Sequence, residues 1–197
     1  DEFHTKERHH EFLAISSHEL FHYWNVKRIR PIEMFPYNYT RENYSRLGYV
    51  YEGITTYYGD YMLLRSGVFS FEDYTEQANA DLQKHFDNEG RYNYSVAESS
   101  FDTWLDGYVP GVPGRKVSIY TEGMLAAFML DMELRYASNN EKSLDTVMKA
   151  LYDDFYKKGK AYSESDFKSL IEKIGGKSFD YFFEEFYWGK GNIEKAL

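Results

Sequence analysis

The chain has 197 residues, carries a formal net charge of −9 and contains no cysteine. This length suits one domain or one large piece of a longer protein, and the acidic balance argues against nucleic acid as a partner. Without cysteine there are no disulfides, thiolate metal sites or cysteine nucleophiles, so histidine and carboxylate are the metal ligands available. No apolar stretch is long enough to span a bilayer. Because the chain does not begin with methionine, we expect an excised or processed segment, and its compartment, cytoplasmic or extracytoplasmic, stays open.

Residues 1–26 predict one long helix that contains the sequence His18-Glu19-Leu20-Phe21-His22. Residues four apart lie on the same helix face, so both imidazoles can turn a nitrogen toward one ion. Glu19 then stands beside that ion, where it can take the proton of a metal-bound water. This spacing is typical of a zinc hydrolase helix. The alternative is a chance pentapeptide on an exposed helix, but apolar neighbours indicate a helix that is buried: Phe12, Leu13, Ile15, Leu20 and Phe21.

Three further histidines, His4, His9 and His10, precede this motif. None has a carboxylate at ligand spacing in a buried stretch, so we expect solvated side chains rather than a second metal site. The helix has to end before Pro31, because proline disfavours helix in the residue that precedes it. We expect residues 30–39 to form an aromatic loop that wraps across the site.

A second helix is predicted from Thr40, whose hydroxyl can cap it, to Arg65. Glu52 is the single acidic residue in the apolar and aromatic run 49–58. An ionised glutamate in such a segment is costly unless it is paired or bound to a metal. We therefore expect Glu52 to be the third metal ligand, with a surface glutamate as the alternative. Asp60 is either an outer partner of a metal-bound histidine or an ordinary surface aspartate.

Five further helices are predicted from capping serines and apolar periods. The helix over residues 118–136 is apolar nearly all round, which indicates a buried central helix. The helix over residues 178–188 is rich in aromatics, which we expect to serve as core and domain contact rather than to bind a ligand. Residues 91–118 are expected to be a functional loop with a helical turn over 101–105. The remaining helices begin with a serine and an early acidic residue and cover residues 70–86, 143–156 and 163–174.

Three sequence runs accompany the histidine motif. Residues 23–31 directly follow it and read Tyr-Trp-Asn-Val-Lys-Arg-Ile-Arg-Pro. Residues 52–55 read Glu-Gly-Ile-Thr, and residues 120–123 read Tyr-Thr-Glu-Gly. With these runs the chain resembles the glycyl aminopeptidase family, which consists of PDZ-bearing metallopeptidases of the gluzincin group. That group is distantly similar to aminopeptidase N and to thermolysin. The run over residues 23–31 is specific to the family, whereas the histidine motif alone does not separate one gluzincin from another.

The resemblance implies a mostly α, thermolysin-like (gluzincin) helical catalytic domain of about seven helices with long aromatic-rich loops, over residues 1–197 as a single domain. It implies one Zn²⁺ on His18, His22 and Glu52. It also implies that Tyr120 donates to the oxyanion of the tetrahedral intermediate, although Tyr120 could simply pack at a helix start. The family's N-terminal β portion, which holds the substrate amine, and its PDZ module have no counterpart in this sequence, so exopeptidase and endopeptidase activity both stay open.

These features predict a zinc metallopeptidase, most simply an aminopeptidase, that cleaves peptide or protein substrates when Glu19 assists attack by a zinc-bound water. The ligand set suits zinc best, while cobalt and manganese fit the same residues. Two alternatives are a non-catalytic helical scaffold that binds a peptide or a neighbouring domain, and zinc-dependent hydrolysis of an ester or epoxide. Asn25 is expected to orient either its loop or the substrate. Four aromatic residues are expected to shape and dry the cleft: Tyr23, Trp24, Tyr57 and Tyr58.

Overall fold

The structure is a computed structural model that describes residues 4–106, 111–190 and 193, and these residues form helices and no strand. The mostly helical prediction is confirmed. The α-helices are α1 (Lys6–Phe21), α2 (Ile54–Arg65), α3 (Phe71–Asp87), α4 (Val96–Phe101), α5 (Thr103–Asp106), α6 (Thr121–Ala137), α7 (Leu144–Asp154), α8 (Glu164–Gly175) and α9 (Asp180–Phe182). Single turns of 3₁₀ or π geometry are η2 (Ile32–Met34), η3 (Tyr49–Gly53), η4 (Glu89–Tyr92), η5 (Tyr156–Lys158) and η6 (Phe183–Tyr187).

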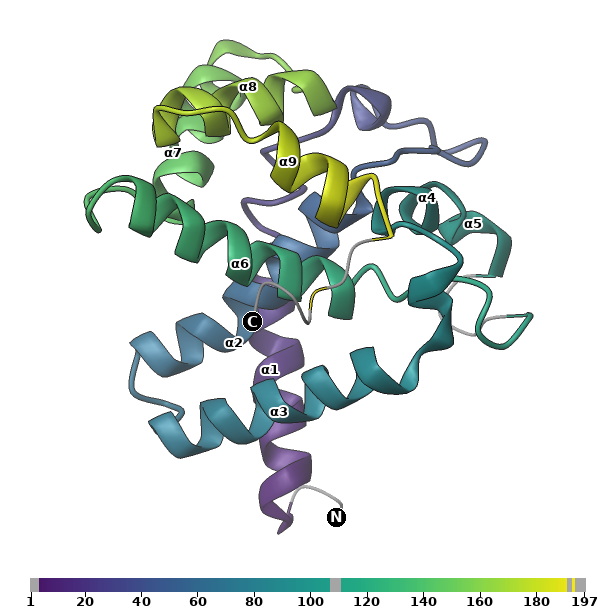
Figure 1. Ribbon diagram of the computed structural model, residues 1–197, viewed down its shortest axis with the longest axis vertical. Coiled ribbons are helices and arrows are strands. Elements are labelled where there is room, and N and C mark those ends of the chain that lie inside the picture. Colours follow the sequence, from purple (N-terminus) through teal and green to yellow (C-terminus); the bar gives the residue numbers. More distant parts are fainter. Residues whose placement is uncertain (1–3, 107–110, 191–192, 194–197) are drawn as a thin grey trace.

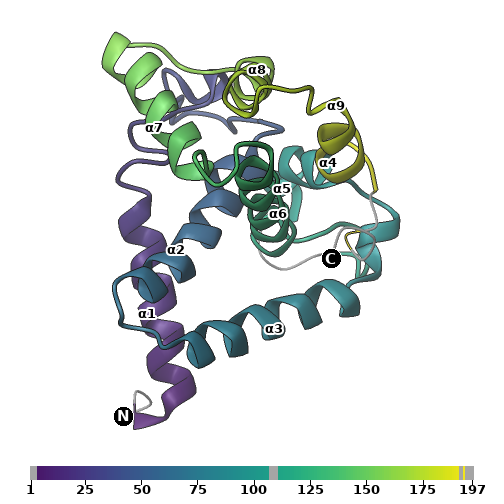
Figure 2. The ribbon, with the colours of Figure 1, turned by 60° about the vertical axis from the view of Figure 1, so that its left-hand side comes forward.

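Helix α6 runs through the middle of the fold, with α1, α2 and α3 on one side and α7, α8 and α9 on the other (Figures 1 and 2). It packs against η3 and α2, and its Leu130 and Leu134 side chains are fully buried. Burying a leucine contributes about 1.5–3 kcal/mol relative to leaving it exposed. The prediction of a buried central helix is confirmed, and η3 packs directly against this helix.

The aromatic residues near the C-terminus fix η3 from the other side. Tyr187 stacks on Tyr49 with 4.2 Å between the ring centroids, and both rings are fully buried. The Tyr49 hydroxyl donates to Glu164 at 2.9 Å, and the Trp188 indole donates to the same carboxylate at 2.8 Å. The prediction that these aromatics belong to the core is confirmed for Phe179, Phe182, Phe183 and Tyr187 but is wrong for Tyr181, which is exposed. Tyr187 and Trp188 hold the segment that carries Glu52.

Helix α1 ends at Phe21, so the predicted helix over residues 1–26 is wrong at its end, and residues 1–3 lie outside the described part of the chain. The chain turns away because Asn25 is fully buried and its side chain donates to the Val50 carbonyl and to the Thr55 hydroxyl, at 2.9 and 3.1 Å. After Phe21 the chain continues in turns, in which the Tyr23 and Trp24 backbone N–H groups donate to the Leu20 and Phe21 carbonyls.

The second predicted helix begins too early. Thr40 caps no helix, because its hydroxyl donates to the Asn38 side chain at 2.7 Å and closes a turn. Helical geometry starts at Tyr49, with the π turn η3 running into α2. The expected loop over residues 91–118 also contains more helix than predicted, because Ser95 and Glu98 form a capping box that starts α4.

Helix α1 is less buried than its apolar residues suggest. None of its residues is buried, and Phe12, Ile15 and Leu20 are exposed, so the expectation of a buried helix is wrong.

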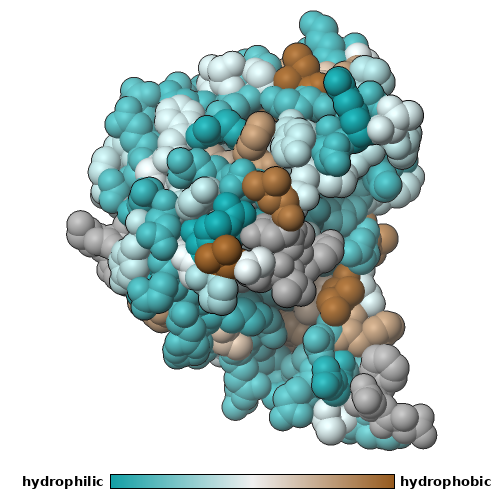
Figure 3. Space-filling model, turned by 90° about the vertical axis from the view of Figure 1, so that its right-hand side faces the viewer, coloured by the Kyte–Doolittle hydropathy of each residue, from teal (hydrophilic) through white to brown (hydrophobic). Residues whose placement is uncertain are grey.

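The surface of the molecule shows no large hydrophobic patch on the face drawn in Figure 3, which views the right-hand side of Figure 1. This face is mostly hydrophilic and carries separate hydrophobic spots. In the described part of the chain no helix is both long enough and apolar enough to cross a membrane.

Candidate functional site

The site begins with two histidines one turn apart near the end of α1. Thr5 caps the start of this helix by accepting from the Arg8 backbone N–H at 3.3 Å, and the last helical turns present His18 and His22 to α2. Their ring centroids lie 4.6 Å apart with the ring planes nearly perpendicular. The spacing of four residues therefore places both imidazoles over the same point, as the sequence predicted.

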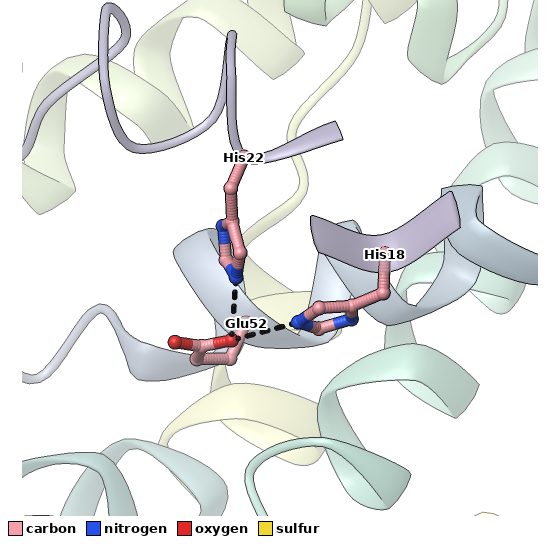
Figure 4. A group of neighbouring side chains, drawn as sticks. All are labelled: His18, His22 and Glu52. Atoms are coloured by element: carbon pink, nitrogen blue, oxygen red, sulfur yellow. Dashed lines mark ion pairs between the residues drawn. The ribbon is translucent and has the colours of Figure 1, made fainter. Parts of the chain in front are cut away.

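Glu52 comes to meet them from the π turn η3 (Figure 4). Its Oε2 atom lies 3.3 Å from Nε2 of His18 and 3.2 Å from Nε2 of His22. All three side chains are largely buried, with 14 to 19% of their surface exposed. π turns inside longer helices occur often at functional sites, and this one carries the glutamate that the sequence singled out.

The outer nitrogen of each imidazole is already occupied. Nδ1 of His22 lies 2.7 Å from the Asn25 carbonyl, so it carries the hydrogen and donates it. Nδ1 of His18 lies 3.3 Å from the Thr56 hydroxyl, which gives its own hydrogen to the Glu52 carbonyl at 2.9 Å. His18 therefore donates through Nδ1 as well. These hydrogen bonds leave the lone pair of both Nε2 atoms directed at the Glu52 carboxylate.

Three electron-pair donors thus converge within 4.8 Å of one another and could hold a metal ion. Glu52 Oε2 is buried and accepts no hydrogen bond from the described residues. Burial opposes protonation of His22, but its contact with the Glu52 carboxylate outweighs burial and raises the pKa of His22. Burial likewise disfavours the charge on Glu52, yet the two histidines lower the pKa of Glu52. The two imidazoles therefore favour the ionised form of this carboxylate.

Two of the three donor separations have the length expected around a tetrahedral metal ion. Ligand atoms about 2.0–2.1 Å from such an ion lie about 3.3 Å from each other, which matches the 3.3 and 3.2 Å separations between Glu52 Oε2 and the imidazoles. In the described part of the chain no second group of histidine and carboxylate side chains converges in this way. His4 and His9 are exposed, and His10 is half-buried against the Phe69 ring.

The two other predicted site residues border the same hollow. Glu19 and Tyr120 line a cavity of about 460 Å³ together with His18, His22 and Glu52. Glu19 is exposed and makes no ion pair or hydrogen bond with the described residues, so its carboxylate faces solvent. Tyr120 precedes α6, and its ring centroid lies 6.1 Å from that of His18. The structure therefore brings all five residues to one place.

Comparison with known proteins agrees with this geometry. The family model of the M61 glycyl aminopeptidases matches residues 11–126, a stretch that is more than half of the chain and contains all five residues. The chain belongs to this family. It is also similar to the structure of an aminopeptidase N family protein from Idiomarina loihiensis, with a TM-score of 0.90 and 30% sequence identity. That similarity covers 98% of this chain and 34% of the other, so this chain spans about a third of that relative's length. No curated protein matched.

This M61 chain uses one residue at its site that the sequence did not single out, Thr56, which orients His18. That role has no signal in the sequence, because the contact is set by how α1 packs on α2. Asn25, expected to orient either its loop or the substrate, holds its loop through Val50 and Thr55. Asp60, expected either beside a histidine or on the surface, does neither: both outer nitrogens have other partners, and Asp60 is buried.

A second pair absent from the predictions lies just behind Tyr120. His85 on α3 and Glu122 on α6 are both buried, and Nδ1 of His85 lies 2.8 and 2.9 Å from the two carboxylate oxygens. The pair ties the end of α3 to the first turn of α6. It therefore fixes the helix start at which Tyr120 stands.

The aromatic residues expected around the cleft are elsewhere. Tyr57 and Tyr58 are buried, and their hydroxyls donate to Asp131 and Asp145 at 2.9 and 2.7 Å. Tyr23 and Trp24 are exposed and line neither of the two cavities that border Glu52. That expectation is wrong because Tyr57 and Tyr58 are buried in the core and Tyr23 and Trp24 lie in the exposed turn that follows α1. Other aromatics line the larger of these cavities: Tyr37, Tyr39, Tyr51 and Trp104.

Asp60 supplies a stability prediction with a defined sign. Burial, followed by the charge of Asp81, raises the pKa of Asp60 to about 7, whereas an aspartate in an unfolded chain titrates near 3.9. The folded state therefore holds a proton that the unfolded state loses, and stability falls as the pH rises from about 4 to 7. We expect Asp60→Asn to make the chelator-treated protein more stable than the parent at pH 8, by a few kcal/mol, and to change it far less at pH 5.

Denaturant unfolding of parent and variant at both pH values measures this difference. Asp87→Asn, which removes an exposed carboxylate at the end of α3, is the control for the loss of one charge. An Asp60→Asn effect of the same size at pH 5 and pH 8 would contradict the assignment.

Proposed function

We propose that this M61 chain is the helical catalytic domain of a zinc-dependent peptidase of aminopeptidase type. The observation that carries the proposal is the convergence of three electron-pair donors, His18 Nε2, His22 Nε2 and Glu52 Oε2, with both imidazoles oriented by hydrogen bonds at Nδ1. Two imidazoles and a carboxylate suit zinc, with an open fourth position in catalytic sites. When bound, zinc supplies a water acidified to a pKa of about 7 and polarises the substrate carbonyl.

Glu19 is proposed to move the proton. It follows His18 directly, lines the same cavity and has no partner among the described residues that would occupy its carboxylate. It takes a proton from the attacking water and passes it to the leaving amine, so one carboxylate acts first as base and then as acid. Exposure suits this role, because a carboxylate held in an ion pair accepts a proton poorly.

Tyr120 is proposed to donate its phenolic hydrogen to the oxyanion that forms as the carbonyl is attacked. Its ring stands next to His18, and its helix start is fixed by the His85–Glu122 pair. The name of the family, glycyl aminopeptidase, indicates the substrates to try first: peptides with a small N-terminal residue.

Metal content by elemental analysis of chelator-free protein tests the site. We expect one zinc per chain in the parent, and less than about a tenth of that in Glu52→Ala and His22→Ala, since losing one of three ligands costs more than the 10- to 100-fold that an outer partner costs. Hydrolysis of glycyl and alanyl peptides is measured on the same samples and should fall with the metal.

His9→Ala is the matched control, because it removes an exposed histidine from the same helix. It should keep both the metal and the activity. A parent protein that takes up no zinc, while circular dichroism shows it folded, would contradict the proposal and favour the non-catalytic binding scaffold.

A further inference from the structure

A second, larger cavity shares Glu52 and Tyr120 with the first cavity but is not lined by Glu19. Its volume is about 830 Å³, and Glu52 and Tyr120 line both hollows, so the proposed metal centre stands where the two meet. A peptide whose scissile bond lies at the metal centre has to place one of its halves here. The side chains that line this cavity therefore contact that half of the substrate.

The charge of this cavity is opposite to that of the whole chain. Its described lining includes three cationic side chains, Lys27, Arg30 and Lys116, and one carboxylate, that of Glu52. The chain as a whole has 32 acidic and 23 basic residues. Cationic side chains therefore outnumber carboxylates on this lining, which makes the cavity positive. A hollow lined by one sign of charge focuses its field on a ligand of the other sign.

Two of these cations are free to bind a ligand. Lys27 and Arg30 form no ion pair with any carboxylate in the described part of the chain, although the fold fixes their positions. The Lys27 backbone N–H donates to the His22 carbonyl at 3.1 Å, and Ile29 is buried between the two residues. Arg30 uses only Nε, which donates to the Lys27 carbonyl at 3.2 Å. Its two terminal nitrogens therefore stay available to donate a pair of hydrogen bonds to the two oxygens of a carboxylate.

The rest of the wall suits a peptide backbone and its apolar groups. Tyr37 and Tyr39 pack together with 4.9 Å between ring centroids, and Trp104 lines the same cavity with nearly half of its surface exposed. Aromatic rings cover a large area at a low cost in conformational entropy. The aromatic wall therefore provides contact area for the peptide, and the cations select peptides that carry a carboxylate.

We propose that this cavity binds a carboxylate of the peptide substrate, either an acidic side chain or the free C-terminus of a short peptide, through Arg30 and Lys27. The proposal rests on the proposed peptidase function for its place in catalysis. It makes the protein selective for carboxylate-bearing peptides on one side of the cleaved bond. Neutral and cationic peptides of the same length are poorer substrates.

The test uses the full protein and four tripeptides with an N-terminal Ala-Ala, ending in Glu or Gln, each as free acid and as amide. We expect kcat/KM to be about tenfold higher for peptides that carry the recognised carboxylate, mainly through KM, and the advantage to shrink at high salt. A preference for both free acids assigns the C-terminus, whereas a preference for Glu over Gln in the amides assigns the side chain. Values within twofold for all four peptides would overturn the proposal.

The variant Lys27→Ala/Arg30→Ala should reduce the tenfold preference to twofold or less, and Arg30→Lys should retain part of it. Lys142→Ala is the control, because it removes an exposed lysine that lines neither cavity and should leave the preference intact. A preference that survives the double variant would overturn the assignment to these residues.

Binding separates this proposal from the proposed function. The dissociation constants of dye-labelled Glu and Gln peptides are measured on Glu19→Gln protein, in which turnover should be too slow to interfere. If the parent cleaves no peptide, the peptidase proposal fails, yet an approximately tenfold tighter binding of the carboxylate peptide still supports the cavity's role. Equal binding of all the peptides overturns the cavity proposal whether or not the parent cleaves them.

Discussion

Glu19→Gln is expected to lower the rate of peptide hydrolysis by about two to four orders of magnitude while the protein keeps its metal. Glutamine has nearly the same shape as glutamate but cannot take up a proton, so only the transfer of the proton is lost. The three proposed ligands do not depend on Glu19, whose carboxylate makes no ion pair or hydrogen bond with the described residues. The measurements are kcat with an alanyl peptide and zinc content by elemental analysis.

Glu11→Gln is the matched control, since Glu11 is exposed on the same helix and only pairs with Arg8. It should leave the rate within about twofold of the parent, because exposed ion pairs of this kind contribute little. A Glu19→Gln protein that retains more than about a tenth of the parent rate would contradict the assignment and move the base to another residue. A protein that lost its metal as well would show a structural role instead.

The sequence predicts the central part of the site because that part is local. His18 and His22 are one helical turn apart, and a helix places them together whatever surrounds it. Glu52 was identified by a different rule, that an ionised carboxylate in an apolar segment needs a partner. The structure places it 3.2 and 3.3 Å from the two imidazoles, so the residue that the rule selects lies beside the histidines, at a distance that the rule could not give.

What the sequence missed depends on contacts between distant segments. The end of α1 is set by Asn25, whose partners Val50 and Thr55 lie 25 and 30 residues further on. Thr56 orients His18 across a separation of 38 residues. The burial of α1 was overestimated for the same reason, because apolar residues on a helix show which face can be buried but not what covers it.

Gly53 and Gly123 belong to two of the sequence runs that resemble the family. The structure shows why each of these positions requires glycine. A Cβ atom built on Gly53 would lie 2.4 Å from Cα of Gly123, and one built on Gly123 would lie 2.7 Å from Cα of Gly53. The two backbones therefore touch where η3 crosses α6. Gly53 has ordinary helical dihedral angles, with φ −63° and ψ −49°, so close approach and not an unusual conformation requires glycine there.

Gly53→Ala should consequently destabilise the protein, although helix propensity alone predicts the opposite. Replacing glycine by alanine inside a helix contributes about 1 kcal/mol of stability, whereas overpacking typically costs about 1–3 kcal/mol or more. The clash here is with backbone, which cannot rotate away as a side chain can. We expect a net loss of about 2 kcal/mol or more in the free energy of unfolding. Because Glu52 is the preceding residue, separating η3 from α6 should also displace its carboxylate and weaken metal binding.

Denaturant unfolding and zinc content of Gly53→Ala measure the two effects together. Gly111→Ala is the control, since a Cβ there meets no atom within 4 Å and the residue is exposed, so it should change neither quantity by much. Gly123→Ala should reproduce the Gly53→Ala result, because the clash is reciprocal. If both variants were as stable as the parent and kept one zinc per chain, η3 and α6 would not be in backbone contact at these two glycines. The position of Glu52 would then depend only on the aromatic packing of Tyr49 against Tyr187.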